Sequence, residues 1–456
     1  MVTTRETVRW DIVDEHLDDA EYLLEPMLDA FDSATTTFTR LSRGLESRFL
    51  AHVDGLAVGG DAVAEQRLWP LLEPDAGTPE RTAAACLALL VAPHPAALDR
   101  VISILRALEP GPTREGIVLA LRLAPRHDVS ARLLSACESG DDIARSALLP
   151  VVAARGGIVG AVATAWLKRA VRSLEPTDRL TALGVAQWCP RAVALALAEP
   201  ALGDPDPAVQ RLAMQVALVH GSPHAHAFAL EVAAARRPAD VDTVRACMTA
   251  VALGGEVTTV ELLAARLVDA ATRPSAIWAL GFTGRLDAVP HLLPLLGDET
   301  LAGLAAEAIV GITGVRRDDT RYWVPTEAQP PVTDEDITGP VPADPDGAVL
   351  MPAEDLALPL PVAAWFEYAW AEAKPHVDAR VRYGEGLALV STGSYAEVLE
   401  STTMRRRHVV ALELAVRTRG EFRIPTRGLS GQQRGHLAAL TPSRSIDGAR
   451  PYARIS

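Results

Sequence analysis

The stretch from Ser275 to Gly314 limits the possible folds of this chain more than any other. Its apolar residues recur with helical periodicity in three short segments that are separated by turn residues. The middle segment places Val289, Leu292, Leu293 and Leu296 at positions i, i+3, i+4 and i+7 of one helix face. The first of the three segments is expected to form a helix that ends at Gly284. Helices this short cannot bury their apolar faces alone, so each of them needs a similar helix beside it. This requirement predicts an α-solenoid.

Similar apolar segments recur along most of the chain. Segment 204–221 (DPDPAVQRLAMQVALVHG) resembles segment 298–314 (DETLAGLAAEAIVGITG), and an acidic residue or proline at the start is typical of a helix N-terminus. The spacing gives helix pairs of roughly 30 residues. The segments expected as helices are 78–91, 95–108, 112–123, 127–138, 141–154, 158–173, 177–187, 190–198, 206–219, 223–236, 240–253, 257–270, 274–283, 287–296 and 299–313.

Composition and periodicity divide the chain into four parts. We expect a helical N-terminal region (1–76), a solenoid of short helical repeats (77–317), an acidic linker (318–361) and a small, mainly helical C-terminal unit with a frayed tail (362–456). The predicted fold class is therefore all-α. Within the C-terminal unit, the segment RVRYGEGLAL is expected to be extended.

The linker is defined by its composition. From Val324 to Pro361 there are nine prolines, eight acidic residues and no basic residue. This composition is typical of an extended or partly disordered linker. A strap lying across the solenoid is the alternative, with Val349, Leu350 and Met351 as its apolar anchor.

The charge balance argues against two classes of partner. The formal net charge is −14, whereas nucleic acids and anionic membranes attract basic surfaces.

The sequence contains no apolar run of about 18 residues, so no transmembrane helix is expected. The N-terminus has no apolar signal segment, and the four widely spaced cysteines indicate buried free thiols in a reducing compartment. A cytoplasmic location follows from these expectations.

Three groups of residues are candidate contacts for a protein partner. The first is Trp278 and Phe282, which belong either to the core or to a concave, peptide-binding groove. The second is an aromatic cluster on one short helix, Trp365, Phe366, Tyr368 and Trp370, which covers too much of the circumference for one side to bury. The third is Arg405, Arg406 and Arg407 at the start of a helix, where cations are mildly unfavourable.

Each group also has a simpler interpretation. The arginines fit a solvated helix that forms salt bridges, including salt bridges to the acidic linker. Trp278 and Phe282 fit the core, or the surface on which the C-terminal unit docks. The acidic stripe between Asp11 and Glu21 fits a solvated face, with contact to a basic partner as the alternative.

No sequence motif indicates catalysis. The chain lacks a phosphate-binding loop, a dinucleotide fingerprint, GxSxG, HExxH and zinc-knuckle spacing. His220, His224 and His226 lie close together, but the turn residues between them favour a solvated loop over a metal site. We therefore expect no catalytic residue, no metal and no cofactor.

Three segments resemble a bacterial family of HEAT-repeat proteins whose genes lie near type VI secretion genes. They are LESRFLAHVDGLAVGG with TAAACLALL (82–90), the repeat core 277–314 followed by an acidic insert, and AAWFEYAWAEAKPHVDARVRYGEG followed by RRRHVVALELAVRTRGEF. The order of repeat core, acidic insert, Trp-rich helix and Arg-rich helix is the most specific part. The resemblance implies an accessory, adaptor or scaffold role near a secretion machine.

The leading hypothesis is a non-catalytic, protein-binding scaffold. One alternative is an enzyme or enzyme subunit that uses a HEAT-like solenoid, as in lyase-type proteins that handle a tetrapyrrole; it needs a deep pocket with a Cys, His or acidic cluster. Another is a nucleic-acid protein of the alkyl-base glycosylase kind, which needs a basic concave track. The net charge disfavours the latter.

Overall fold

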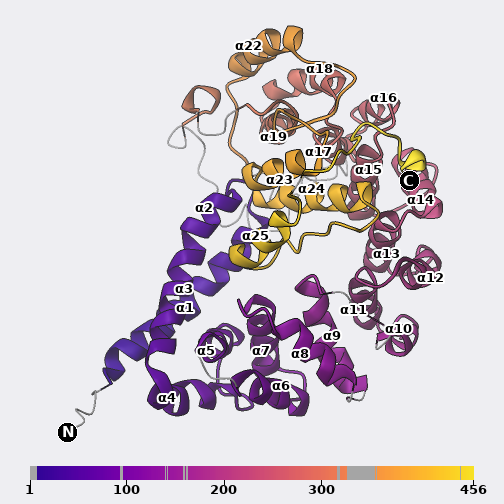
Figure 1. Cartoon of the computed structure of the whole chain (residues 1–456). Coiled ribbons are helices and arrows are strands. Elements are labelled where there is room, and N and C mark those ends of the chain that lie inside the picture. Colours follow the sequence, from indigo (N-terminus) through magenta and orange to yellow (C-terminus); the bar gives the residue numbers. More distant parts are fainter. Residues whose placement is uncertain are drawn as a thin grey trace, which may run out of the picture. The chain divides into compact units, whose positions relative to one another are not determined.

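The computed structural model describes residues 8–92, 96–138, 140, 142–157, 160, 163–315, 319–325, 355, 357–441 and 443–455. These residues are mostly helical and contain a single two-stranded sheet (Figure 1). The all-α expectation is therefore confirmed. Most of the expected linker, including the Val349–Met351 anchor, lies outside the described residues.

Two compact units make up the chain. Unit 1 comprises Met1–Ala194 and Ile424–Ala438, and unit 2 comprises Leu195–Arg423 and Ala439–Ser456. These units are defined by contacts in space, whereas the boundaries expected after residues 76, 317 and 361 follow composition and periodicity.

Unit 1 is built from short helices and one C-terminal helix, α25. Their bounds are α1 (Trp10–Asp29), α2 (Phe38–Arg43), α3 (Leu45–Val58), α4 (Gly60–Val63), α5 (Pro79–Val91), α6 (Ala97–Ala107), α7 (Pro112–Leu123), α8 (Val129–Glu138), α9 (Asp142–Ala154), α10 (Thr164–Ala170), α11 (Pro176–Ala186) and α25 (Ser430–Ala438). Helix α12 (Arg191–Ala201) spans the boundary between the units. Helix α5 packs on α1, α3 and α7.

Helix α25 joins the N-terminal helices through a buried carboxylate. Both the backbone N–H and the hydroxyl of Ser430 donate hydrogen bonds to Glu46, and the two N–H···O distances are 3.0 and 2.9 Å. Gln432 donates to the carbonyl of Ala124 at 2.6 Å. Unit 1 therefore combines segments from both ends of the chain.

Unit 2 contains the remaining helices and a hairpin. Its elements are α13 (Pro207–Val219), α14 (Pro223–Ala233), α15 (Val241–Leu253), α16 (Thr259–Ala265), α17 (Arg273–Leu280), α18 (Val289–Leu292), α19 (Ala302–Thr313), α22 (Ala363–Ala373), β1 (Tyr383–Gly384), β2 (Leu387–Ala388), α23 (Thr392–Ser401) and α24 (Met404–Arg417). Helix α15 packs on α13, α14 and α17, and α17 packs on α19.

Side-chain caps explain why several of these helices begin where they do. Asp206 accepts hydrogen bonds from the N–H groups of Ala208 and Val209, as the Asp-Pro-Asp-Pro segment predicts. Ser222 and Asp240 cap α14 and α15 in the same way. The strands β1 and β2 pair antiparallel, which confirms the extended stretch expected there.

The stretch Ser275–Gly314 differs from its expected form in two places. Helix α17 ends at Leu280, four residues before Gly284, and Gly284 instead adopts a positive φ of 61° in the following turn. The second segment is α18 flanked by 3-10 turns (Leu286–Ala288 and Leu293–Gly297). Proline at positions 290 and 294 removes backbone donors that a continuous helix needs.

The prediction of a frayed C-terminal tail was wrong. Tyr452 is 3% exposed, and its hydroxyl donates to the carbonyl of Leu218 at 2.9 Å. Its backbone N–H donates to Glu256, and its ring stacks on His226 with centroids 4.7 Å apart. The tail is fixed because one aromatic side chain inserts against α13, α14 and the turn before α16.

Alanine and leucine are the most frequent residues of the core. On α19 every residue from Ala302 to Ile312 is buried, since alanine and glycine allow neighbouring helices to approach closely. All four cysteines are buried and free, as expected. Within the described part of the chain, no helix is long and apolar enough to cross a membrane.

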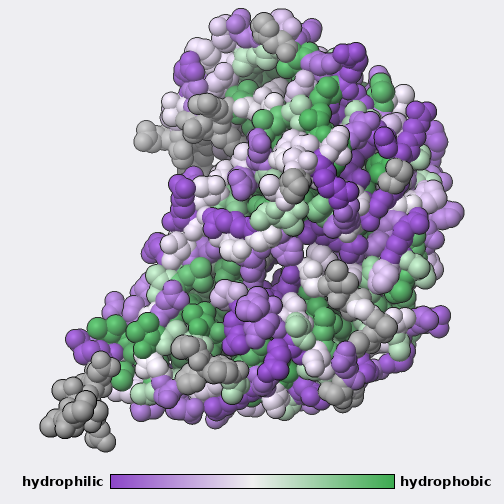
Figure 2. Space-filling view, viewed as in Figure 1, coloured by the Kyte–Doolittle hydropathy of each residue, from purple (hydrophilic) through white to green (hydrophobic). Residues whose placement is uncertain are grey.

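Hydrophilic residues cover most of the visible face of the molecule (Figure 2). Hydrophobic residues gather over the first turns of α1, at the lower left of the view. Ile12 there is 40% exposed.

Candidate functional site

The candidate site is the first half of α24, which the sequence marks by three consecutive arginines. Arg405, Arg406 and Arg407 are 8%, 2% and 0% exposed. They do not form the solvated face that a charged helix usually has. Each guanidinium finds its partners within unit 2, so these arginines hold unit 2 together.

Arg405 binds two buried carboxylates from distant parts of the chain. Its Nε donates to Glu307 on α19 at 3.0 Å, and its Nη1 donates to Asp355 at 2.8 Å. Asp355 also accepts two hydrogen bonds from Arg245 on α15, at 2.6 and 3.1 Å. Two guanidinium groups and two carboxylates thus form one buried cluster, which we call the Arg405 cluster.

Burial and pairing act in opposite directions on this cluster. Burial alone would lower the pKa of Arg405, but the adjacent carboxylates of Glu307 and Asp355 outweigh it, so the pKa of Arg405 is raised. For Arg407, burial outweighs the opposing charge of Glu400. Burial lowers its pKa to about 9, and its Nε donates to the carbonyl of Leu399 at 2.6 Å.

Trp278 and Phe282 lie directly against these arginines. The guanidinium carbons of Arg245 and Arg405 stand 4.6 and 4.9 Å from the centre of the Trp278 ring, and that of Arg406 stands 4.1 Å from the Phe282 ring. Guanidinium groups at such distances are attracted by the ring faces. The two aromatic rings meet edge-on, with their centroids 4.8 Å apart. They contact α24, which belongs to the expected C-terminal unit, and docking of that unit was one of the alternatives given by the sequence.

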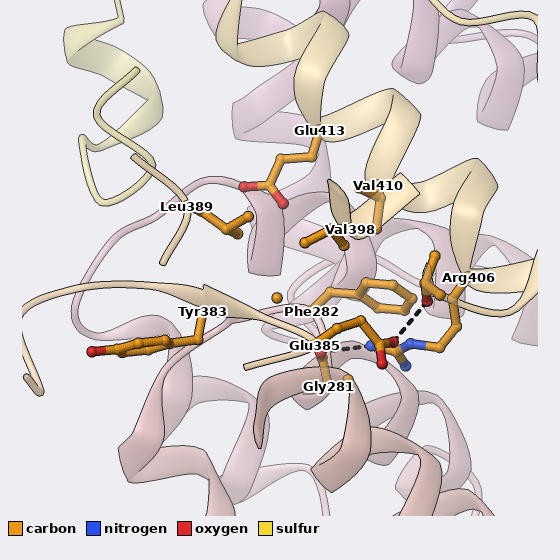
Figure 3. A pocket seen from close by; sticks show the side chains of 12 residues that line it. Gly281, Phe282, Tyr383, Glu385, Leu389, Val398, Arg406, Val410 and Glu413 are labelled. Atoms are coloured by element: carbon orange, nitrogen blue, oxygen red, sulfur yellow. Dashed lines mark hydrogen bonds between the residues drawn. The ribbon is translucent and has the colours of Figure 1, made fainter. Parts of the chain in front are cut away.

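Two glycines make room for the Arg406 side chain. Arg406 donates to the carbonyl of Gly281 at 2.9 Å (Figure 3). A Cβ atom at Gly311, inside α19, would stand only 1.9 Å from Nη2 of Arg406. A side chain at this helix position would therefore displace the buried guanidinium from its present place.

The cavity beside Arg406 is small. It measures about 20 Å³, and Leu389, Val398 and Val410 line it together with Arg406 and Glu413 (Figure 3). A cavity of this size holds about one water molecule. It is too small for a substrate or a cofactor.

A larger groove lies beside α24, on helices α13, α15 and α17. Its volume is about 280 Å³, and its lining comes from α13, α15, α17 and α24. The apolar part of the lining includes Met214, Trp278, Val409 and Leu412, and the charged part includes Arg211, Asp242 and Arg245. A groove with this lining can take an apolar side chain and hold polar groups next to it.

The aromatic helix α22 is only partly buried. Phe366 is 1% exposed and packs edge-on against Tyr322 and Trp323, with centroids 5.5 Å away in each pair. Trp365 is 38% exposed, and Tyr368 is 57% exposed. Trp370 is half-buried. One side of α22 is thus buried and the other is exposed, as expected for a helix whose aromatic residues cover much of its circumference.

The residues that the sequence predicted as contacts for a protein partner differ in how far they are buried. Trp278, Phe282, Phe366 and Arg405–Arg407 are buried by this chain's own residues, while Trp365 is accessible. Contact of any of them with another protein stays a prediction.

Of the histidines, His220 is buried and His226 packs on the C-terminal tail. Among the described residues no group of three or more His, Cys, Asp or Glu side chains forms a metal site.

Sequence reasoning offered one partner of these residues, since Asp355, which pairs with Arg405, belongs to the expected acidic linker. It missed the others. Glu307 stands in an alanine-rich apolar segment, where a single carboxylate signals a buried ion pair, since an unpaired one would be costly. Arg382 and Glu413 form a second buried pair, and Tyr395 donates to Glu413 at 3.0 Å. No pattern in the sequence links residues so far apart.

Comparison with known proteins gives little further information. No family model matches this chain, and no curated protein matches it. Among solved structures, it is similar to the X-ray structure of the Escherichia coli protein YibA, a structural genomics target. The two chains are 11% identical with a TM-score of 0.32, and the match covers 68% of this chain and 98% of that chain. A TM-score this low supports no conclusion about fold or function.

Proposed function

We propose that this chain is a non-catalytic scaffold of HEAT-like repeats, an α-solenoid, that binds another protein in the cytoplasm. We propose further that it is accessory to type VI secretion. The proposal is supported by the order of short helices from α13 to α19, in which α15 and α17 pack on their neighbours. The resemblance carried by the repeat core and the Arg-rich helix supports the secretion context.

One observation carries the proposal: the repeat helices already hold a polypeptide helix. Helix α24 contacts α13, and its arginines reach Glu307 on α19 and the carbonyl of Gly281 after α17. Further along α24, Arg417 donates to the carbonyl of Leu253 at the end of α15. A repeat surface that binds one helix through arginine, carboxylate and tryptophan contacts has the chemistry for binding a second polypeptide.

The open groove beside α24 is the proposed place for the partner. Val409 and Leu412 are only half-buried, and they share the groove with Met214 and Trp278. An apolar side chain of the partner would cover these groups, and Asp242 is exposed for polar contacts. Buried apolar anchors surrounded by polar residues carry most of the energy of protein interfaces.

Affinity capture of the full chain from its native cells tests this function. The wild type is compared with Leu412→Asp, which places a charge in the groove, and with Val268→Asp as the matched control. Val268 is 83% exposed in the same unit and outside the groove. The wild type and the control are expected to recover the same protein, identified by mass spectrometry as a secretion component, and Leu412→Asp is expected to lose it.

Two results would overturn the proposal. One is that the wild type recovers no stable partner under native conditions. The other is that Leu412→Asp, folded by circular dichroism, retains the partner as well as Val268→Asp does.

A further inference from the structure

A second pocket of unit 2 lies between the end of α24 and the C-terminal segment 444–455. Its volume is about 320 Å³, which is at the lower end of the range for small-molecule sites. The charged side chains in its lining are Arg417, Arg444, Arg450, Glu421 and Asp447. We call it the Arg417 pocket. None of its lining residues belongs to the groove proposed for the protein partner.

Arg417 is the unusual member of this lining, because it is a buried cation with incomplete pairing. The residue is 6% exposed. Its two terminal nitrogens donate to the carbonyls of Arg450 and Leu253. Its Nε makes no hydrogen bond, and the nearest carboxylate oxygen, on Glu413, is 3.6 Å away.

Glu413 neutralises Arg417 only in part, because another arginine already pairs with the same oxygen. Arg382, which is 1% exposed, forms an ion pair with Oε1 of Glu413, the atom that also faces Arg417. Two buried guanidinium groups thus share one carboxylate. Burial lowers the pKa of Arg417, and the charge of Arg382 lowers it further, so that the opposing charges of Glu413 and Glu256 compensate only in part. A buried cation without a full counter-charge is costly, and here it lines a pocket.

The other charges of the pocket are more accessible. Arg444 pairs with Glu421, and each of these side chains is more than half exposed. Arg450 and Asp447 are 3.8 Å apart and also well exposed. Ion pairs between exposed groups are weak, so an anion in the pocket can draw Arg444 and Arg450 away from their carboxylates at little cost. The pocket therefore offers one fixed guanidinium and two adjustable ones.

We propose that the Arg417 pocket binds the phosphate group of a small molecule. The buried guanidinium of Arg417 provides the fixed positive charge, and Arg444 and Arg450 close on the phosphate oxygens. Guanidinium groups match phosphate geometrically and form charge-assisted hydrogen bonds with it. The volume admits a phosphate with a small attached group, and Phe422 lines the same pocket as an apolar surface for that group. This inference does not rest on the proposed scaffold function.

Titration calorimetry of the full chain with inorganic phosphate tests the proposal. Sodium chloride at equal ionic strength shows the effect of salt alone. Arg450→Ala and Arg444→Ala remove the adjustable guanidinium groups and leave the buried core in place. Arg380→Ala is the matched control, because Arg380 is an exposed arginine of the same unit that pairs with Asp378 outside the pocket. Arg417→Lys is a fourth variant, used only if circular dichroism shows that it folds.

The wild type and Arg380→Ala are expected to bind phosphate with the same affinity. Arg450→Ala and Arg444→Ala should each weaken binding about tenfold, the loss typical of one charge-assisted hydrogen bond. The proposal is overturned if phosphate gives no more heat than chloride, or if the pocket variants bind phosphate as well as Arg380→Ala does.

Discussion

Arg405 on α24 and Glu307 on α19 form a buried ion pair across 98 positions of the sequence. Nε of the arginine donates to Oε1 of the carboxylate at 3.0 Å. The two side chains are 7% and 5% exposed. This pair attaches α24 to α19, the last helix of the stretch Ser275–Gly314, so the Arg-rich segment is a structural attachment within unit 2.

Removing Arg405 should therefore destabilise unit 2 strongly. Arg405→Ala leaves Glu307 and Asp355 buried with a missing counter-charge, which typically costs about 3–5 kcal/mol. Chemical denaturation followed by tryptophan fluorescence measures the loss. Arg380→Ala, which breaks an exposed pair with Asp378, should leave the midpoint unchanged. Equal midpoints for the two variants would show that the Arg405 cluster contributes nothing to stability.

The glycine at position 311 should resist the substitution that usually stabilises helices. Alanine is favoured over glycine inside a helix by about 1 kcal/mol. Gly311→Ala should nevertheless lower the unfolding free energy, because the new Cβ would collide with Arg406. The control is Gly184→Ala in α11, where a Cβ meets nothing within 4 Å. This variant should be more stable than the wild type. Thermal denaturation of both variants checks the predicted opposite signs.

Glu46 should make the stability of unit 1 depend on pH. Burial raises the pKa of Glu46, although the hydrogen bonds from Ser430 partly oppose this. A carboxyl with a raised folded pKa favours folding when it is protonated, and this contribution is lost as the pH rises through the folded pKa. Glu46→Gln should thus be at least as stable as the wild type at pH 7.5. The difference should shrink as the pH falls towards 4.5.

A second variant at this position separates charge from hydrogen bonding. Glu46→Ala leaves the N–H and the hydroxyl of Ser430 without an acceptor, which costs about 1–3 kcal/mol. Urea denaturation at several pH values measures both variants. A loss of stability in Glu46→Gln equal to that in Glu46→Ala would contradict this account.

His226 should make the attachment of the C-terminal tail sensitive to acid. Burial lowers the pKa of His226, and Glu256 only partly offsets this effect. A lowered folded pKa gives stability that is present above the unfolded pKa of about 6.5 and is lost as the pH falls. Acidification from pH 7.5 to 5 should therefore loosen the stacking of His226 on Tyr452.

Hydrogen exchange of segment 451–455 at the two pH values measures this loosening. His226→Leu cannot take up a proton, so its exchange should change less with pH than that of the wild type. The matched control is His224→Leu, which removes an exposed imidazole from the same helix and should behave like the wild type. An identical pH response in both variants would exclude His226 as the cause.

Helical periodicity and capping predicted the local structure of the repeats well. Segment 240–253 matches α15 closely, because Asp240 is a strong N-cap and Gly254 follows the last apolar residue. Segment 287–296 was predicted less well, since its apolar spacing is helical while proline at 290 and 294 interrupts the hydrogen bonds. Local patterns therefore specified most helices and some of their ends.

The long-range arrangement could not be predicted in the same way. Arg407 looks like a solvent-facing residue by composition, yet it is fully buried. It is buried where α24 packs on α23, and its Nε donates to the carbonyl of Leu399 on that helix. Tyr452 lies in a polar tail without periodicity, and its position follows from partners more than 190 residues away in the sequence. Such contacts leave no spacing signal in the sequence.

Photo-crosslinking in native cells tests the central claim, that the groove beside α24 binds another protein, most directly. A benzophenone amino acid is placed at position 412 in the groove or at the exposed position 268 outside it. The scaffold account predicts one crosslinked partner protein from position 412 and none from position 268. Absence of a crosslink at position 412, or the same products from both positions, would contradict it.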